Sequence, residues 1–232
     1  MTTVGFRLFT RVERPAPALL ARFAGLASAD VGDVMRTFNV MDPGLVAVVP
    51  GRFCGPAVTV RVRAGDNLMI HKALDVVVEP GDVLVVDGHG DLDNALVGEN
   101  IALWARHKGA AALVIDGGVR DVEALRDIGL PVFARCITPA GSFKVGGGEV
   151  NVPVACARVV VMPGDVVIGD ADGVTVVPRA DLDDVLSGVA AKLEVEARAK
   201  TGIANGDWIR PTCTDDAVRA MGCAFIDAVH RP

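Results

Sequence analysis

The side chains best suited to chemistry lie in the stretch from Gly98 to Asp121, which ends in an adjacent arginine–aspartate pair. The guanidinium of Arg120 offers a planar set of donors that matches a carboxylate. The carboxylate of Asp121 is a hard oxygen ligand of the kind that Mg²⁺ and Mn²⁺ prefer. The pair therefore predicts a site for an anion and a divalent metal ion. In the alternative interpretation, Asp121 only caps a helix and Arg120 is a solvated surface group.

Two other groups of polar side chains are candidates for the same site. Glu99 lies early in the segment before the pair, and the topology could bring it close to Arg120. Taken alone, it is an ordinary solvated helix residue. The segment 87–93 contains three aspartates and one histidine after an apolar strand, a position that suits a site. Turn chemistry explains aspartate and glycine in that segment equally well.

Other kinds of site lack their sequence signals. The glycines at 146–148 fit neither the dinucleotide fingerprint nor the phosphate-binding loop, so we interpret them as a mobile or close-approach loop. No Gly-x-Ser-x-Gly motif occurs, and the few lysines disfavour a Schiff base. The five cysteines include no Cys-x-x-Cys, and the four histidines show no ligand spacing to them. This pattern indicates a reducing compartment and argues against structural zinc.

Composition limits the class of protein. The chain has 232 residues, a formal charge of -6 and 51% hydrophobic residues, which is enough for one domain with a sizeable core. An acidic chain without basic runs argues against nucleic-acid binding. No uninterrupted apolar run is long enough to span a bilayer, and no charged-then-apolar leader opens the sequence. We therefore expect a cytoplasmic protein that binds neither nucleic acid nor membrane.

The elements around the pair follow from apolar patterning. A strand over 111–115, a turn over 116–119 and a helix over 122–128 would place Arg120 and Asp121 at the carboxyl end of a strand. Strand ends of this kind, followed by a helix start, tend to bind anions in α/β folds. Upstream, the patterns predict a buried strand over 83–86, a loop over 87–91 and a helix over 92–107.

The rest of the chain mixes strands and helices without strict alternation. We expect helices over 15–27, 28–38 and 68–74, strands over 57–62 and 132–135, and a long helix over 181–200. This arrangement favours an α/β fold with a layered sheet or half-barrel over a plain doubly wound sheet.

Six segments in a fixed order carry a family resemblance: 55–60, 80–87, 98–99, 116–121, 163–165 and 170–174. Together they resemble the family that contains the 4-hydroxy-4-methyl-2-oxoglutarate aldolases and the RraA-type regulators of ribonuclease E. The aldolases carry an acid, twenty intervening residues and then Arg-Asp. Glu99 and Arg120 have that spacing, with glutamate where the motif usually has aspartate.

The resemblance implies a fold similar to the swivelling phosphohistidine domain. One RraA-like domain with N-terminal helices would cover 1–206, and a C-terminal tail would follow over 207–232. Members of the family resemble one another in assembling as trimers or hexamers. The likeness therefore implies a homotrimer or a hexamer here.

The resemblance also implies roles for individual residues. Asp121 would ligate Mg²⁺ or Mn²⁺, largely through water, and Arg120 would contact the pyruvate portion of the substrate. A glutamate from the C-terminal helix of a neighbouring subunit would complete the site, and Glu196 is the candidate, with Glu194 as the alternative. The catalytic set would be Arg120, Asp121, Glu99 and Glu196.

The same likeness implies a binding site for the substrate carboxylate on backbone N–H groups just after a glycine. A helix start offers unpaired N–H groups to an anion, which agrees with this role. The residues concerned are Gly98, Glu99, Asn100 and Ile101.

By resemblance, the function would be that of a metal-dependent class II pyruvate aldolase. Its substrate would be a small 4-hydroxy-2-oxo acid such as 4-hydroxy-4-methyl-2-oxoglutarate, with oxaloacetate decarboxylation as a side activity. One alternative is a non-catalytic RraA-like regulator that binds and inhibits a ribonuclease. Another is a different metal lyase or hydrolase on the same scaffold, because a fold fixes the place of a site better than its substrate.

Overall fold

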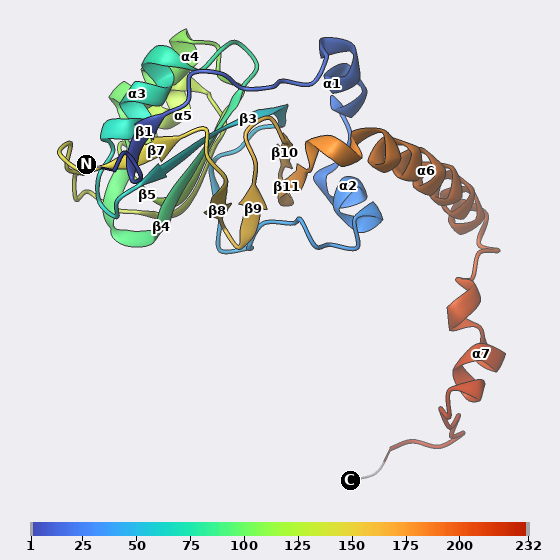
Figure 1. Cartoon of the computed structure of the whole chain (residues 1–232). Coiled ribbons are helices and arrows are strands. Elements are labelled where there is room, and N and C mark those ends of the chain that lie inside the picture. The colour runs from blue at the N-terminus through green and yellow to red at the C-terminus, as the bar shows by residue number, and fades with distance from the viewer. Residues whose placement is uncertain (1, 231–232) are drawn as a thin grey trace. The chain divides into compact units, whose positions relative to one another are not determined.

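The structure, a computed structural model, describes residues 2–230 (Figure 1). The chain divides into two compact units, Met1–Val189 and Ala190–Pro232. In chain order the elements are β1 (Phe6–Leu8), α1 (Pro17–Phe23), α2 (Ser28–Val34), β2 (Val46–Val49), β3 (Phe53–Val62), α3 (Leu68–Val76), β4 (Val83–Val97), α4 (Glu99–His107), β5 (Ala112–Val119), α5 (Val122–Ile128), β6 (Val132–Ile137), β7 (Gly148–Val150), β8 (Val154–Cys156), β9 (Val159–Val161), β10 (Val166–Asp170), β11 (Gly173–Val177), η1 (Arg179–Asp181), α6 (Leu182–Asn205), η2 (Pro211–Cys213) and α7 (Asp215–Ala220).

The first unit is built on a mixed sheet. Its main path runs β1-β7-β3-β4-β5-β6-β2, and β10 and β11 extend the sheet from β3. The four strands β3, β4, β5 and β6 are parallel neighbours, with Leu84 opposite Leu113 and Val114 opposite Phe133. Their carboxyl ends therefore meet at one edge of the sheet, which is where the segments leading into α4 and α5 begin.

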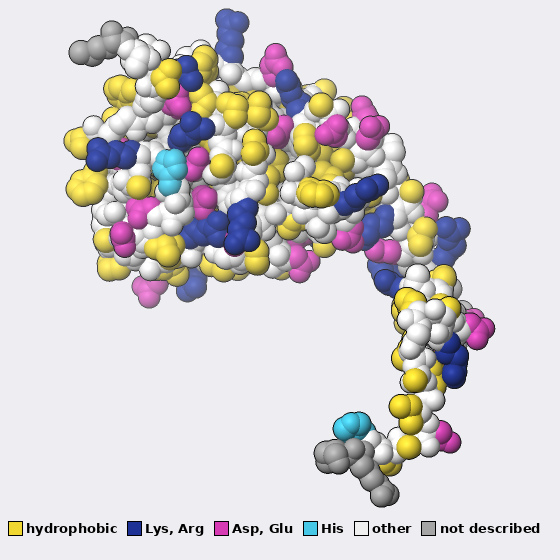
Figure 2. Space-filling view, turned by 60° about the horizontal axis from the view of Figure 1, so that its bottom comes forward, with side chains coloured by type: hydrophobic (Ala, Val, Ile, Leu, Met, Phe, Trp, Pro, Cys, Tyr) yellow, Lys and Arg dark blue, Asp and Glu magenta, His cyan; other side chains and the backbone are white. Residues whose placement is uncertain are grey.

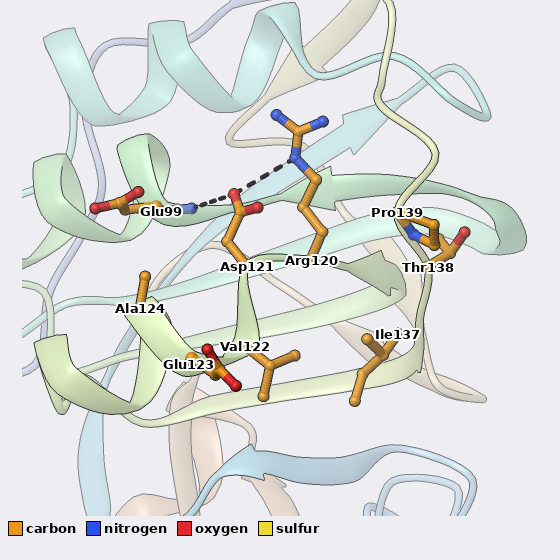
Figure 3. A pocket seen from close by; sticks show the side chains of 9 residues that line it. All are labelled: Glu99, Arg120, Asp121, Val122, Glu123, Ala124, Ile137, Thr138 and Pro139. Carbon is orange, nitrogen blue, oxygen red and sulfur yellow. Dashed lines mark hydrogen bonds and ion pairs between the residues drawn. The ribbon is translucent and has the colours of Figure 1, made fainter.

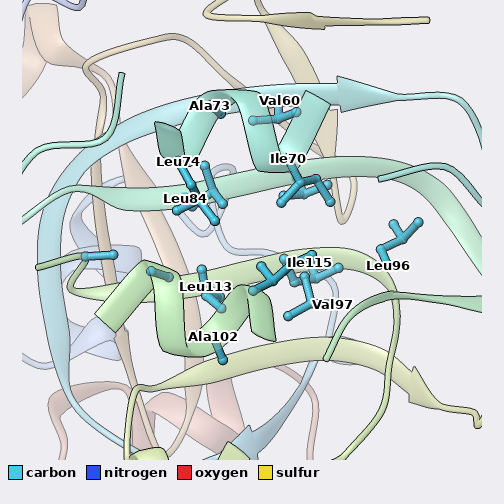
Figure 4. Close-up of a cluster of buried hydrophobic side chains, with 14 of the residues drawn as sticks. Val60, Ile70, Ala73, Leu74, Leu84, Leu96, Val97, Ala102, Leu113 and Ile115 are labelled. Atoms are coloured by element: carbon cyan, nitrogen blue, oxygen red, sulfur yellow. The ribbon is translucent and has the colours of Figure 1, made fainter. Parts of the chain in front are cut away.

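Helices α3, α4 and α5 cover one face of the parallel strands (Figure 1). The side chains between them form a core that includes Ile70, Leu84, Leu113 and Ile115, all fully buried (Figure 4). Burying a side chain of this size stabilises a fold by about 1.5–3 kcal/mol. This core fixes the helices, and with them the starts of α4 and α5, against the sheet.

Strands, and not α3, α4 and α5, cover the other face of the sheet. Residues that alternate with the first core, such as Val83, Val85 and Val114, pack against the two-stranded β8–β9 sheet and β11. All eight residues of β5 are buried, so this strand has apolar neighbours on both faces. That arrangement explains the continuous apolar run over 112–115 and confirms a layered α/β fold.

Two expectations about the strand before α4 were wrong. The segment 87–91 is not a loop and 92–97 is not helical, because β4 continues to Val97 and α4 begins only at Glu99. Residues 92, 95 and 96 are apolar at helical spacing, but this stretch stays paired with β5 through several register shifts. Pairing with a central strand outweighed local periodicity.

The turn expected over 116–119 was also wrong. β5 runs through these residues to Val119 because β4 and β6 flank it on both sides. The glycines serve a close approach of chains: a Cβ on Gly118 would lie 2.7 Å from the carbonyl oxygen of Asn94. The expected helix over 122–128 is confirmed as α5.

The second unit contains the remainder of α6, followed by η2 and α7. None of its described residues, 190–230, is buried, and apolar side chains such as Ile209, Ile226 and Val229 are exposed.

Basic and acidic side chains are interspersed on the face of the molecule shown in Figure 2. Among residues 2–230, no helix has the length and hydropathy needed to cross a membrane.

Candidate functional site

The arginine–aspartate pair lies directly after β5, at the carboxyl edge of the parallel strands. The N–H of Arg120 donates to the carbonyl oxygen of Val97 over 3.0 Å, which ties it to the end of β4. Asp121 occupies the residue before α5 in a left-handed conformation, with φ of 57°. Aspartate tolerates this conformation better than most residues do. The backbone therefore turns both side chains out of the sheet edge.

Asp121 stands in the N-cap position of α5, yet its side chain does not cap that helix. Its Oδ2 instead accepts a hydrogen bond from the backbone N–H of Glu99 over 3.1 Å and lies 3.4 Å from Nε of Arg120 (Figure 3). Within the described part of the chain, no hydrogen bond reaches Oδ1 of Asp121. The simple capping interpretation therefore does not describe this side chain.

Gly98 makes this contact possible. A Cβ at this position would overlap Oδ2 of Asp121 and would lie 3.1 Å from Cγ of Arg120. Its φ of -142° is open to any residue, so space and not backbone strain requires the glycine. The family resemblance implied that Gly98 belongs to the binding site for the substrate carboxylate, which stays a prediction; in the structure it lies beside both members of the pair.

The start of α4 supplies unpaired N–H groups beside the pair. The first bond inside the helix runs from the N–H of Ala102 to the carbonyl of Gly98, so the N–H groups before it have no acceptor within the helix. The N–H of Glu99 is directed at Asp121, while Asn100 and Ile101 line a hollow on the same side. The carboxylate of Glu99 points away from Arg120 and Asp121 (Figure 3).

Two hollows meet at the pair. The larger has a volume of about 630 Å³ and is open to solvent; its lining includes Val122, Ala124, Ile137 and Pro139. The smaller has a volume of about 110 Å³ and a more polar lining. Glu99, Arg120 and Asp121 border both. A small ligand bound where the two hollows meet would lie beside both the guanidinium and the carboxylate.

Sequence reasoning missed four polar residues of the smaller hollow: Asn67, His71, Ser142 and Lys144. Asn67 is buried and donates through Nδ2 to the carbonyl of Leu96 over 2.9 Å, and its Oδ1 has no hydrogen-bond partner among the residues that the structure describes. Burial, followed by the charge of Lys144, lowers the pKa of His71. In the sequence, these residues lie only in or near the turn before α3 and the glycine-rich loop. Neither pattern indicates that its residues bind a ligand.

The polar segment 87–93 serves the fold. Asp87 is buried and accepts bonds from the N–H groups of His89 and Ala155. Asp91 accepts the N–H of Asp93 over 3.0 Å in a local turn. None of these side chains lines either hollow at the pair.

Glu196 lies in α6, in the second unit. Its carboxylate forms ion pairs with Lys192 and Lys200 along the same helix. Glu194, the alternative, is an exposed residue of the same helix. The role expected of either residue belongs to a neighbouring subunit, so it stays a prediction.

The pair offers one hard carboxylate to a metal ion. Among the described residues, no group of three or more His, Cys, Asp or Glu side chains is placed to hold a metal. Mg²⁺ is commonly held by one or two carboxylates, with water and substrate filling the other positions. Asp121, which is 40% exposed and borders both hollows, fits that mode.

Comparison with known proteins agrees with the fold. The family model described as RraA-like, Aldolase/RraA, matches residues 28–176. A provisionally named 4-hydroxy-4-methyl-2-oxoglutarate aldolase from Halalkalibacterium halodurans is 43% identical over 147 residues, 63% of this chain and 70% of that protein. A Thermus thermophilus protein named 4-hydroxy-4-methyl-2-oxoglutarate aldolase is 42% identical over 128 residues, 55% of this chain and 77% of its own.

One solved structure carries a different description. A Streptomyces coelicolor protein, described as an unusual member of the RNase ES inhibitor RraA protein family, has a TM-score of 0.73 and 27% identity. The match covers 82% of this chain and 99% of that one. Both names fall within one family, and its model spans more than half of the present sequence. The chain therefore belongs to the Aldolase/RraA family.

Proposed function

We propose that this protein is a divalent-metal-dependent lyase that cleaves 4-hydroxy-2-oxo acids, such as 4-hydroxy-4-methyl-2-oxoglutarate, and releases pyruvate. The observation that carries the proposal is the contact between Asp121 and the start of α4, which sets a carboxylate and a guanidinium beside two hollows. The aldolase names of two relatives support the same reaction.

Asp121 is the residue that would hold Mg²⁺ or Mn²⁺. Its Oδ2 accepts a hydrogen bond from the N–H of Glu99 and lies 3.4 Å from Nε of Arg120, and the residue borders both hollows. When bound, the ion supplies a Lewis acid for the 2-oxo acid head of the substrate. Glu196 of a neighbouring copy in a homotrimer or hexamer is our candidate for a second carboxylate.

Arg120 has the main electrostatic role among the residues of this chain. Breaking the C3–C4 bond moves negative charge onto the pyruvate half of the substrate. A guanidinium placed beside the enolate oxygen of the pyruvate half would stabilise the charge as it develops, and stabilisation of this kind often contributes more to catalysis than any other effect. The N–H groups of Asn100 and Ile101 are proposed to orient the substrate carboxylate at the helix start. Oxaloacetate decarboxylation develops charge in the same place and is the proposed side activity.

The direct test is pyruvate release from 4-hydroxy-4-methyl-2-oxoglutarate and from oxaloacetate, with Mg²⁺, with Mn²⁺ and with EDTA, after subtraction of the metal-only rate. We expect release that needs both protein and metal, and we expect Asp121→Asn to lose it by about 10²-fold or more. Asp127→Asn, an exposed residue of α5, is the matched control and should keep wild-type turnover.

The second candidate function is the inhibition of a ribonuclease, which the description of the Streptomyces coelicolor neighbour favours. If folded protein releases no pyruvate above the metal-only background, the lyase proposal fails. Binding to a purified ribonuclease of the E type, unaffected by Asp121→Asn, would then support the regulator. Because that variant removes only the site carboxylate, it separates the two functions.

A further inference from the structure

The glycine-rich loop over 141–147 forms one wall of the smaller hollow. Ser142 and Lys144 line that hollow together with Arg120. The first residue of the loop lies close to the guanidinium, because a Cβ added to Gly141 would lie 3.0 Å from Nη1 of Arg120. The position of this loop therefore decides both the shape of the hollow and the space left to the arginine.

The near end of the loop is tied to β4. Nδ2 of Asn94 donates to the carbonyl of Gly141 over 2.9 Å, and the N–H of Ala95 donates to the carbonyl of Ala140 over 2.8 Å. These bonds fix where the loop begins. They do not reach Gly146 and Gly147 at its far end, and glycine has many backbone conformations available.

The far end of the loop is tied to Asp66. This aspartate is only 2% exposed, and its Oδ2 accepts hydrogen bonds from Val145 over 2.8 Å and Gly146 over 2.6 Å. Its Oδ1 accepts the N–H of Leu68 at the start of α3 over 2.9 Å. One carboxylate thus joins the loop to a helix that is fixed in the main core.

The two bonds to the loop distinguish Asp66 from an ordinary helix cap. Burial alone would raise the pKa of Asp66, but the backbone N–H groups outweigh it, so the pKa lies below its usual value. Two backbone hydrogen bonds beside Asp66 join the same turn and loop. The N–H of Phe143 donates to the carbonyl of Gly65 over 2.7 Å, and the carbonyl of Phe143 accepts from the N–H of Asn67 over 3.0 Å. The charged carboxylate is therefore the central acceptor between turn and loop.

We infer that Asp66 is a positioning residue that holds the loop over 141–147 against Arg120 and so maintains the smaller hollow for a small anionic ligand. Only the identity of the ligand, a 2-oxo acid, rests on the proposed function. The positioning role of Asp66 rests on its hydrogen bonds to the loop. Asp66 itself does not line either hollow and acts through the backbone of the loop.

The first variant is Asp66→Asn. Its one carbonyl oxygen can still cap Leu68, but its amide group would face the N–H groups of Val145 and Gly146. Asp170→Asn is the matched control. Asp170 is also buried, and it accepts hydrogen bonds from both the N–H and the hydroxyl of Ser28. It lies at the end of β10 and makes none of the hydrogen bonds that hold the loop. Both variants lose buried hydrogen bonds, so both should melt at lower temperature.

The variants should differ in the loop and at the site. Asp66→Asn should raise hydrogen–deuterium exchange over 141–147 and lower kcat/KM for pyruvate release on the order of tenfold to hundredfold, since small displacements at a site cost this much. Asp170→Asn should change neither. Asn94→Ala releases only the near end of the loop, by removing the hydrogen bond to Gly141. It should also raise exchange over 141–147 and lower kcat/KM, and it replaces Asp66→Asn as the test of loop position if that variant does not fold.

Two results would overturn the inference. One is unchanged exchange over 141–147 in folded Asp66→Asn; the other is an equal loss of kcat/KM in Asp170→Asn. Oxalate binding with Mn²⁺, measured by calorimetry, gives a readout that does not need turnover. If the wild type releases no pyruvate but Asp66→Asn still loosens the loop and weakens oxalate about tenfold or more, the lyase proposal fails and the positioning role stands.

Discussion

Oδ2 of Asp121 accepts a hydrogen bond from the backbone N–H of Glu99 over 3.1 Å, although the two residues follow different strands of the sheet. The bond is possible because β4 and β5 are parallel neighbours, so α4 and α5 begin at the same edge. It holds one carboxylate oxygen in place at the border of both hollows. A pair that is adjacent in sequence thereby gains a fixed third partner.

Replacing Gly98 with alanine should damage the site without unfolding the protein. The added Cβ would overlap Oδ2 of Asp121, so the carboxylate must move away from the N–H of Glu99. We expect the Mn²⁺ concentration that gives half-maximal pyruvate release to rise about 10- to 100-fold, as for the loss of groups that orient a metal ligand. An unchanged metal requirement, with Tm as the folding control, would show that this contact does not matter.

Replacing Arg120 should affect turnover more than binding. Arg120→Ala removes the only guanidinium among residues 2–230 that lines either hollow, and we expect kcat to fall about 10²–10³-fold because transition-state charge loses its partner. Arg120→Lys should recover only part of this loss, since an ammonium cannot form the planar two-donor contact. Arg126→Ala, at an exposed residue of α5, is the control. Near-full activity of Arg120→Ala would contradict the assignment.

The stabilising effect of Asp66 should disappear in acid. Its folded-state pKa lies below the usual value of 3.8, so its contribution is complete above that pH and is lost as the pH falls through the folded pKa. Near neutral pH, Asp66→Asn should lower the free energy of unfolding by about 1.5–3 kcal/mol, the value for a hydrogen bond to a charged group. Denaturant titrations of both proteins should converge below pH 4; a constant difference down to pH 2 would contradict this explanation.

The cysteines should react with thiol reagents in an order set by their surroundings. Burial raises the pKa of Cys54 to about 11, so its reactive thiolate forms only as the pH rises toward that value. Burial also raises the pKa of Cys156 well above its ordinary value. At pH 8 iodoacetamide should therefore modify the exposed Cys213 and Cys223 first. Peptide mass spectrometry over a time course measures the order, and early modification of Cys54 would contradict it.

Local sequence was informative where one pattern agreed with its surroundings. Leu113 and Ile115 lie in an apolar run that forms a strand buried on both faces, and the helix over 122–128 was predicted with its observed bounds. The local pattern gave a wrong prediction where pairing with a neighbouring strand favoured a different structure. Ala95 and Leu96 fit a helical face, but β5 offered hydrogen bonds and burial along its whole length, so they became part of β4.

For the candidate site, the sequence by itself determined which side chains were available, Arg120 and Asp121, whereas the start of α4 after Gly98 appeared only in the structure. The way they meet was decided by tertiary structure. Parallel pairing of β4 and β5 brings the N–H of Glu99 to Asp121, and Asp66 brings the loop over 141–147 to the same hollow from the other side. Residue types follow from the sequence alone, whereas contacts between residues far apart in the chain depend on strand order and register, which the shared core fixes.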